Sequence, residues 1–511
     1  MPVKIKIKKI LCALFIAAVI AAPLASCGGD GSNEQQNNPG QDNGGVNEEI
    51  NGQDGANSGP ETDARPELPD KTYSGRVIKI AAASETLWGN ELICPEAEDG
   101  DLVNDATFRR NRTVEALFDV NLTQVDINFL AFETQFKNSV LAGDNMFDFA
   151  FPRLSHAITL AAGGFLVDLN GVPYINHEQD WWDSAIVRGL SLAGKNFSLA
   201  GDINMYAYDG TFVMAFNKNL HRQLGLENLY DLVNSGKWTV DKLDNIMRAA
   251  VLDLDGDGVM TFDDQFGMYL NDIHAVISFL TAFDCNAFEK TAGSGAEIIF
   301  DVTRDKFVAA IEKINRLIND GDAVFNPTNS SRWRLPSSEW NYAQRVFSDG
   351  RSLFMHQVLD TARMNRGMED DFGLLPVPKF DESQKEYYSP VIDGVYVLSA
   401  PTSLPSENAE MIGGIIEAMA YEGRKQILPA YYDLTLVYKN TRDEESEQML
   451  DIIFSQRKYS LDEAYNFGGM KDRLVDLVRK NSSDLGSLSE RYAAAVQKDI
   501  DKLFEQYAAL D

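Results

Sequence analysis

Apolar positions in the first part of the globular chain switch between two spacings. Residues 76–82 alternate apolar and charged positions and then run apolar, as an inner strand does. Strand-like patterns recur at 120–125 and 147–151, and helical stretches at 105–118 and 131–142 separate them. This strand and helix order predicts an α/β fold with a mostly parallel sheet covered by helices. Ligands of such sheets bind beyond the carboxyl ends of the strands.

Two later helices are predicted from apolar residues at helical spacing. The first stripe is Phe307, Ile311, Ile314 and Ile318, and the second is Leu488, Tyr492, Val496, Ile500 and Phe504. Because such stripes face a core, these side chains are assigned to packing and not to ligand binding.

The N-terminal segment has a different pattern. Lysines at positions 4, 6, 8 and 9 precede an apolar run from Ile10 to Leu24, and small residues follow. This layout predicts a signal peptide over residues 1–26. The apolar run is shorter than the roughly 20 residues that a membrane-spanning helix needs.

The residues around the predicted cleavage point resemble a bacterial lipobox, Leu24-Ala25-Ser26-Cys27. The resemblance implies that Cys27 is acylated and anchors an exported protein to the outer face of the cell membrane. An ordinary signal peptide with a chance cysteine is the alternative. Residues 27–70 are mostly small and polar, and cannot bury enough apolar surface to offset their ordering entropy. They are predicted to form a disordered tether.

Charge and cysteine content narrow the possible functions. The formal charge is −31, and removal of the four signal lysines leaves 42 basic against 77 acidic residues, or −35. Such a field repels nucleic acid and anionic lipid, so membrane contact is expected through the lipid anchor alone. Beyond the signal and anchor, the two remaining cysteines, Cys94 and Cys285, give no disulfide framework. They are either two free thiols or one bridge.

Several segments then follow one another in a recognisable order. They are 143–149, 164–169, 215–226, 371–378 and 393–399, which contain Phe147-Asp148-Phe149, Phe165-Leu166-Val167-Asp168, Phe216-Asn217-Lys218, Gly373-Leu374-Leu375-Pro376 and Asp393-Gly394-Val395-Tyr396. Their order and spacing resemble the extracellular solute-binding proteins of ABC importers, in the class that includes maltodextrin-binding protein. The resemblance covers roughly residues 75 to 435.

That resemblance implies a type II periplasmic-binding-protein fold with two α/β lobes and a ligand cleft between them. The implied N-terminal lobe is 75–208 plus 394–430, and the C-terminal lobe is 211–392 plus 431–511. The implied protein is a monomer that captures a carbohydrate, expected to be an oligosaccharide, and delivers it to an ABC transporter permease. Hinged closure would let a solute that contacts both lobes shift the balance between open and closed states.

Residues 253–264 fit the twelve-residue calcium loop. Its oxygen ligands would be Asp253, Asp255, Asp257, the carbonyl of Val259, Thr261 and Asp264. Gly258 stands at the sharp turn. Asp264 replaces the usual glutamate, so its ligation is less certain. The resemblance suggests a structural Ca²⁺, and an acidic turn without metal is the alternative.

Sugar recognition needs flat apolar faces and planar polar groups, and loops near the predicted cleft supply both. The candidate solute contacts are Glu85, Trp88, Arg153, Asn204, Tyr208, Asp209, Trp333, Trp340, His356 and Asp393. Each tryptophan has packing as its alternative, and His356 has a satisfied interior position as its alternative.

The chain carries no nucleophile elbow, zinc-protease motif or phosphate-binding loop, so no catalytic residues are assigned and an enzyme is not expected. The alternatives in ligand class are an acidic sugar or another polar solute. A surface glycoside hydrolase or lyase, and a sensory or adhesive protein, are the alternatives in function.

Overall fold

A computed structural model describes residues 65–85, 92–291, 297–319, 321–329, 333, 343–437 and 444–510. The predicted signal peptide, Cys27, Trp88 and Trp340 lie outside these residues, as does all of the tether before residue 65. Ala64–Asp511 form one compact unit. No helix within the described residues has both the length and the apolar character that a bilayer crossing requires.

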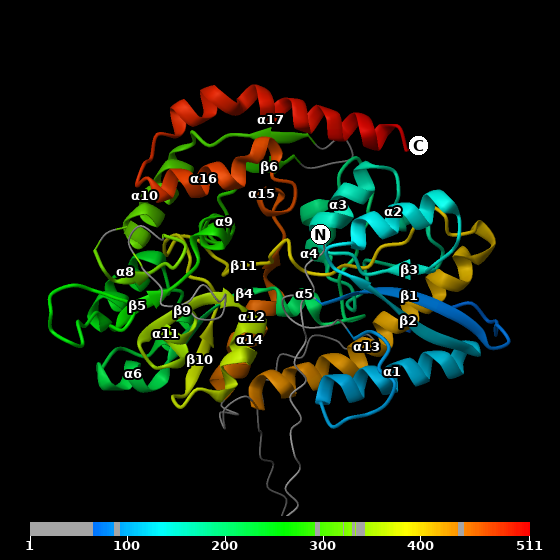
Figure 1. Cartoon of the computed structure of the whole chain (residues 1–511), viewed down its shortest axis with the longest axis horizontal. Coiled ribbons are helices and arrows are strands. Elements are labelled where there is room, and N and C mark those ends of the chain that lie inside the picture. The colour runs from blue at the N-terminus through cyan, green and yellow to red at the C-terminus, as the bar shows by residue number, and fades with distance from the viewer. Residues whose placement is uncertain are drawn as a thin grey trace, which may run out of the picture. The chain divides into compact units, whose positions relative to one another are not determined.

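The first sheet has three parallel strands in the order β2-β1-β3 (Figure 1). They are β1 (Arg76–Ser84), β2 (Val120–Asn128) and β3 (Phe149–Ala150). Residues Ile78 and Ile80–Ala83 of β1 are completely buried because β2 and β3 flank the strand on both edges. The predicted strands are confirmed, although regular pairing in the third is limited to two residues.

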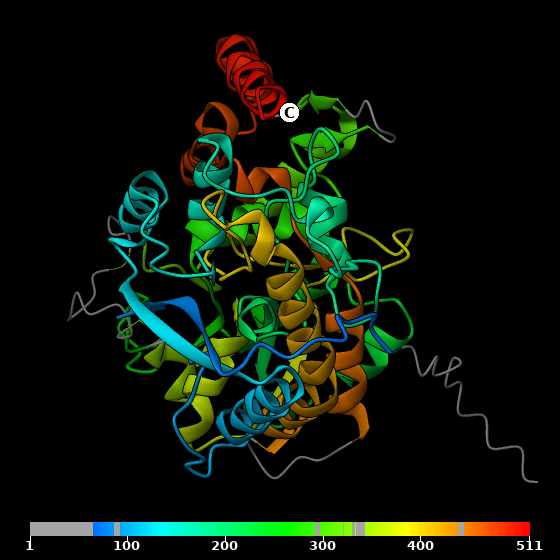
Figure 2. The same cartoon turned by 90° about the vertical axis from the view of Figure 1, so that its right-hand side faces the viewer.

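The two helices predicted in this half are confirmed as α1 (Leu102–Phe118) and α2 (Phe132–Ala142), and three shorter helices that were not predicted follow them. These are α3 (Leu154–Ala162), α4 (Ser184–Leu190) and α5 (Tyr206–Asp209). Asp101 caps α1 by accepting from two backbone amides, and Gly143 ends α2 at a φ of 62°. Helix α13 (Ala409–Val437) returns to pack along α1, as Figure 2 also shows.

The second sheet has five strands in the order β10-β4-β9-β5-β8. They are β4 (Phe212–Asn217), β5 (Phe266–Tyr269), β8 (Val324–Phe325), β9 (Ser352–Val358) and β10 (Phe372–Leu375). Strand β5 runs parallel to β8 and β9, whereas β4 is antiparallel to its two neighbours. All six residues of β4 are buried, consistent with its inner position.

Helices cover this sheet and complete the chain. They are α6 (Lys218–Gln223), α7 (Leu229–Asn234), α8 (Val240–Met247), α9 (Asp272–Ala282), α10 (Asp305–Asn319), α11 (Arg345–Ser348), α12 (Leu359–Met364), α14 (Glu444–Ser455), α15 (Leu461–Ala464), α16 (Met470–Arg479) and α17 (Leu485–Ala508). Strands β6 (Phe288–Lys290) and β7 (Ile298–Phe300) form a separate hairpin. Both helices predicted from apolar stripes, α10 and α17, are confirmed.

Several segments connect the two sheets. Thr211, just before β4, pairs with Val391, and β11 (Ser389–Pro390) runs parallel to β12 (Arg457–Lys458). Figure 1 shows β11 between the two groups of strands. Ser399 then pairs with Ala150 of β3, which returns the chain to the first sheet. The chain therefore passes between the sheets near 206–211 and near 391–399.

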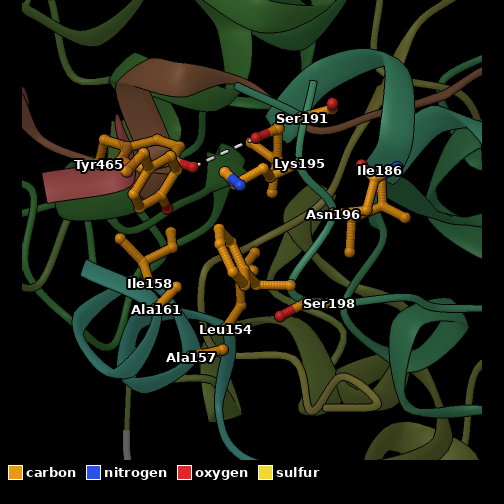
Figure 3. A pocket seen from close by; sticks show the side chains of 13 residues that line it. Leu154, Ala157, Ile158, Ala161, Ile186, Ser191, Lys195, Asn196, Ser198 and Tyr465 are labelled. Carbon is orange, nitrogen blue, oxygen red and sulfur yellow. Dashed lines mark hydrogen bonds between the residues drawn. The ribbon is translucent and has the colours of Figure 1, made fainter. Parts of the chain in front are cut away.

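A small cavity lies where α17 meets α3 and α4. Its volume is about 30 Å³, and Tyr465 and Tyr507 are among its lining residues. Tyr465 donates to the carbonyl of Leu190 at 3.2 Å (Figure 3). That volume suits about one water molecule, so the cavity cannot hold a sugar ring.

Candidate functional site

Polar residues end the strands of the first sheet. Asn128, the last residue of β2, donates from Nδ2 to Glu85 at 2.7 Å, and Glu85 directly follows β1. Arg153 follows β3 and precedes the first turn of α3. These side chains stand at the carboxyl ends of parallel strands, where ligands of α/β sheets bind.

The second sheet presents a similar edge at the end of β5. Asn271 accepts from the amide of Ile273 and so begins α9, which places Asp272 and His274 in its first turn. Asp272 is buried, and both of its oxygens accept from Arg479 at 2.8 Å. This bidentate pair attaches α16 to the start of α9.

Arg153, at the edge of the first sheet, belongs to a group of alternating charges, which we call the interlobe cluster: Arg153, Asp393, Glu463 and Lys471. Arg153 Nη2 lies 3.2 Å from Asp393 Oδ1. Lys471 Nζ lies 3.7 Å from Asp393 Oδ2 and 2.7 Å from Glu463 Oε1. The cluster therefore joins α3, the 389–395 crossing, α15 and α16 through side chains.

The electrostatics of the cluster keep its lysine charged. Burial alone would lower the pKa of Lys471, but Glu463 and Asp393 outweigh burial and raise it. Nearby, burial lowers the pKa of His274 to about 4, and the charge of Lys471 adds to this effect. His274 is therefore neutral at physiological pH, with one ring nitrogen able to accept a hydrogen bond.

Three buried polar atoms around the cluster have no hydrogen-bond partner among the described residues. They are Nε of Arg153, Nδ1 of His156 and Nδ1 of His274. Each buried polar atom left without a partner costs about 1–3 kcal/mol. The region of the cluster thus contains one donor and two ring nitrogens whose hydrogen-bonding capacity is unused among the described residues.

Two tyrosine rings pack together next to the backbone of Arg153. The ring of Tyr206 lies edge-on to that of Tyr396, with centroids 6.1 Å apart. Tyr396 pairs through its backbone with Arg153, and the hydroxyl of Tyr206 accepts from the amide of Leu92 at 2.5 Å. Aromatic faces next to charged side chains are the combination that sugar rings use.

The structure brings together only some of the predicted contacts. Arg153 and Asp393 meet in the cluster, and Glu85 stands at the same edge of the first sheet as Arg153. Asn204 is buried and accepts from the amide of Tyr206 at 3.2 Å, which gives it a structural role at the start of α5. Asp209 accepts from the hydroxyl of Tyr431 at 2.7 Å and so joins α5 to α13.

Two predicted contacts lie in the core, and the expectation that they touch solute is corrected for this structure. Trp333 is 4% exposed and packs edge-on against Phe266 and Phe325 at 5.2 and 5.4 Å. His356 is 1% exposed and stacks between Phe212 and Phe279 at 5.1 and 4.9 Å. Burial lowers the pKa of His356 to about 3, so this ring is a neutral packing element.

Tyr208 is also buried, but it faces another part of the molecule. Its hydroxyl donates to Asp202 at 2.6 Å, and the guanidinium carbon of Arg457 lies 3.7 Å from its ring centroid. Tyr208 also lines a pocket together with residues of α4, α13 and α14.

Residues that the sequence reading missed complete the site. Lys471, Glu463 and His274 come from segments far from Arg153 in sequence, on α16, α15 and α9. A usable signal existed for His274. It follows the buried strand Phe266–Tyr269 by five residues, so the strand-end rule applied to the second sheet would have selected it.

The acidic loop at 253–264 is organised by its own backbone. Gly258 N donates to Asp253 at 2.7 Å, and Val259 N donates to Asp257 at 2.7 Å. Among the described residues, Asp253, Asp255 and Asp257 offer carboxylate oxygens within 4.8 Å of one another. Asp264 is 2% exposed and accepts from the amides of Leu254 and Thr261 at 2.8 and 2.6 Å.

The two cysteines that were predicted to be either free or bridged, Cys94 and Cys285, are free thiols.

Several solved structures have a similar fold, and the similarity extends over nearly the whole length of each solved protein. An ABC substrate-binding protein of Listeria monocytogenes, in complex with cycloalternan, is 11% identical with a TM-score of 0.52, over 85% of this chain and 99% of its own. The cyclic alpha-maltosyl-1,6-maltose binding protein of Arthrobacter globiformis is 14% identical with a TM-score of 0.52, over 85% and 99%. A sugar transporter of Rhizobium etli in an open conformation is 12% identical with a TM-score of 0.52, over 85% and 100%.

No protein-family model and no curated protein matches the sequence. At such identities the structural likeness shows the fold. The chain therefore has the two-lobe α/β fold of maltodextrin-binding-like solute-binding proteins, which confirms the predicted fold class.

Proposed function

We propose that this chain is a lipid-anchored receptor that captures a carbohydrate, expected to be an oligosaccharide, and delivers it unaltered to an ABC transporter permease. The observation that carries the proposal is the interlobe cluster. Side chains from the start of α3, the 389–395 crossing, α15 and α16 converge there, and Arg153, His156 and His274 have buried polar atoms that lack partners among the described residues. Similar proteins that bind cycloalternan and cyclic maltosyl-maltose support the carbohydrate class.

The binding step follows from this geometry. A hydroxyl that accepts from Arg153 Nε and another that donates to His274 Nδ1 would remove two unsatisfied groups, one on each side of the cleft. Because these groups come from different lobes, a solute gains both bonds only when the lobes are close together. Nothing in this step breaks a covalent bond, so the solute is released as it was bound.

An acidic sugar is the second candidate ligand. It is favoured by the cationic groups Arg153 and Lys471, since a carboxylate pairs well with a guanidinium. Against it, Asp393 and Glu463 already balance those charges in this conformation.

We also propose that residues 253–264 hold a structural Ca²⁺. The support is the sequence pattern together with three carboxylates whose oxygens approach within 4.8 Å. Asp253, Asp255 and Asp257 would hold the ion, with Val259, Thr261 and Asp264 completing its shell. The cation would offset the repulsion among these carboxylates and so stabilise the second sheet's half of the molecule.

The test of the receptor function is binding of residues 65–511 to a glycan panel that includes neutral maltodextrins and uronate oligomers. We expect saturable binding in the micromolar range and no change in glycan mass. A neutral glycan that binds at least tenfold better than its uronate counterpart supports the first candidate ligand, and the reverse supports the second. Cleavage of the glycan would identify an enzyme instead.

A further inference from the structure

A second pocket lies apart from the interlobe cluster and shares no residue with it. Its volume is about 570 Å³. It is walled by the segment before α4, by α4 itself, by α13 and α14, and by β12. The lining residues that matter here are Trp182, Asp183, Tyr208, Tyr432, Asp451 and Arg457. The function proposed above assigns nothing to it.

Buried charged groups form the floor of this pocket. Arg457 Nη2 pairs with Asp183 at 3.2 Å, and both side chains are 6% exposed. Its Nε and Nη1 atoms have no hydrogen-bond partner among the described residues. The guanidinium stacks on Tyr208. A buried guanidinium with two unused N–H groups calls for an acceptor in the pocket that it lines.

Carboxylates also line the pocket, and these groups accept hydrogen bonds rather than donate them. Five carboxylates and three guanidinium groups line the pocket, which leaves a net charge of −2. Asp451 accepts from the hydroxyl of Tyr432 at 3.3 Å and forms no ion pair among the described residues. The net negative charge disfavours an anionic ligand, and the carboxylates favour a ligand that donates hydrogen bonds.

We propose that this pocket is a binding site for a neutral polyhydroxylated solute the size of one or two sugar rings. A hydroxyl group accepts from Arg457 and donates to Asp451, so it meets both requirements at once. The partly exposed rings of Tyr432 and Phe454 line the same pocket and offer apolar faces to a sugar ring. The site is independent of the proposed receptor function, because it uses none of the cluster residues.

The test reads the pocket directly with an environment-sensitive fluorophore attached through Ser455→Cys, since Ser455 lines the pocket and is exposed. A fluorophore attached through Ser483→Cys, on an exposed residue outside the pocket, is the control. Glucose, maltose and maltotriose are the neutral probes, and spermidine and citrate are the charged ones. Titrations are repeated with Arg153→Met to remove the cluster's contribution.

We expect a saturable signal at position 455 with glucose or maltose, none at 483, and persistence of the signal in the Arg153→Met background. Tyr432→Ala and Asp451→Asn should each weaken it at least tenfold, whereas Tyr432→Phe, which keeps the ring, should weaken it less than threefold. The proposal is overturned if no neutral probe gives a signal, if spermidine or citrate binds more tightly, or if Arg153→Met abolishes the response. Loss of the signal in Arg153→Met would leave the receptor function standing and remove the second site.

Discussion

The guanidinium of Arg153 and the carboxylate of Asp393 lie 3.2 Å apart although 240 residues separate them in sequence. Arg153 follows the last strand of the first sheet, and Asp393 stands in a crossing between the sheets. Their contact therefore joins the carboxyl end of a strand in the first sheet to the segment that connects the two sheets.

Replacement of Arg153 tests the role of this pair in solute binding. Arg153→Met keeps most of the side-chain volume but removes the Nε donor and the charge. We expect the dissociation constant for the best glycan to rise at least tenfold, equivalent to about 1.4 kcal/mol, in calorimetric titrations. Arg109→Met is the matched control, because Arg109 forms an exposed ion pair with Glu98 and should leave affinity unchanged. Equal affinity for both variants would remove Arg153 from the site.

Trp333 should behave as a core residue. Trp333→Ala is expected to destabilise the protein by about 3–5 kcal/mol, because it opens a cavity against Phe266 and Phe325. Denaturant unfolding would measure this, and glycan affinity should change less than threefold under conditions where the variant is folded. A large loss of affinity with unchanged stability would restore Trp333 as a solute contact.

Calcium removal tests the acidic loop. A chelator should lower the melting temperature of the protein, and added Ca²⁺ should restore it. Asp253→Asn and Asp257→Asn should each abolish this calcium dependence, whereas Asp263→Asn, at a position that is not a ligand in the pattern, should preserve it. A melting temperature indifferent to chelator would mean that the loop holds no structural metal.

Glu417 predicts a specific pH dependence of stability. It accepts from the indole nitrogens of Trp181 and Trp182 at 2.9 Å each, and burial raises its pKa to about 7. Since its pKa in the unfolded chain is near 4.5, the folded state holds a proton that the unfolded state has lost between these values. This contribution to stability is therefore complete below pH 4.5 and is lost as pH rises toward 7.

The measurement compares the wild type with Glu417→Gln, which cannot ionise. Between pH 5 and pH 7.5 the wild type should lose roughly 2–3 kcal/mol of unfolding free energy relative to the variant, because only the wild type carries the ionisable Glu417. Glu422→Gln is the matched control, because it removes a carboxylate from the same helix, one that pairs with Lys425 at 3.2 Å and not with the two tryptophans. A difference that stays constant with pH would contradict the account of Glu417.

Local sequence patterns predicted many of the observed helices and strands. Alternation at 76–82 and the stripe from Phe307 to Ile318 depend on neighbours within one element, and both predicted the observed element. Short strands such as β8 and β12 carry no such signal, because two residues cannot show a period. Their pairing is decided by distant strands.

The site was harder to predict for the same reason. Arg153 was found because it follows a predicted strand, and Asp393 because it begins the recognised segment 393–399. Their partner Lys471 lies on α16, where no sequence pattern indicated a charged contact. Trp333 was misread because its sequence surroundings look like a loop, while its burial comes from Phe266 and Phe325 on separate strands. Long-range packing of this kind is invisible to local patterns.

The central claim is that a carbohydrate binds reversibly at the interlobe cluster and leaves unchanged. Calorimetric titration of residues 65–511 with the glycan panel, followed by mass spectrometry of the released ligand, tests it most directly. We predict at least one glycan that binds with a micromolar dissociation constant, loses tenfold or more in affinity with Arg153→Met, and is recovered with its original mass. Absence of binding across the panel, or recovery of shortened glycans, would contradict the claim.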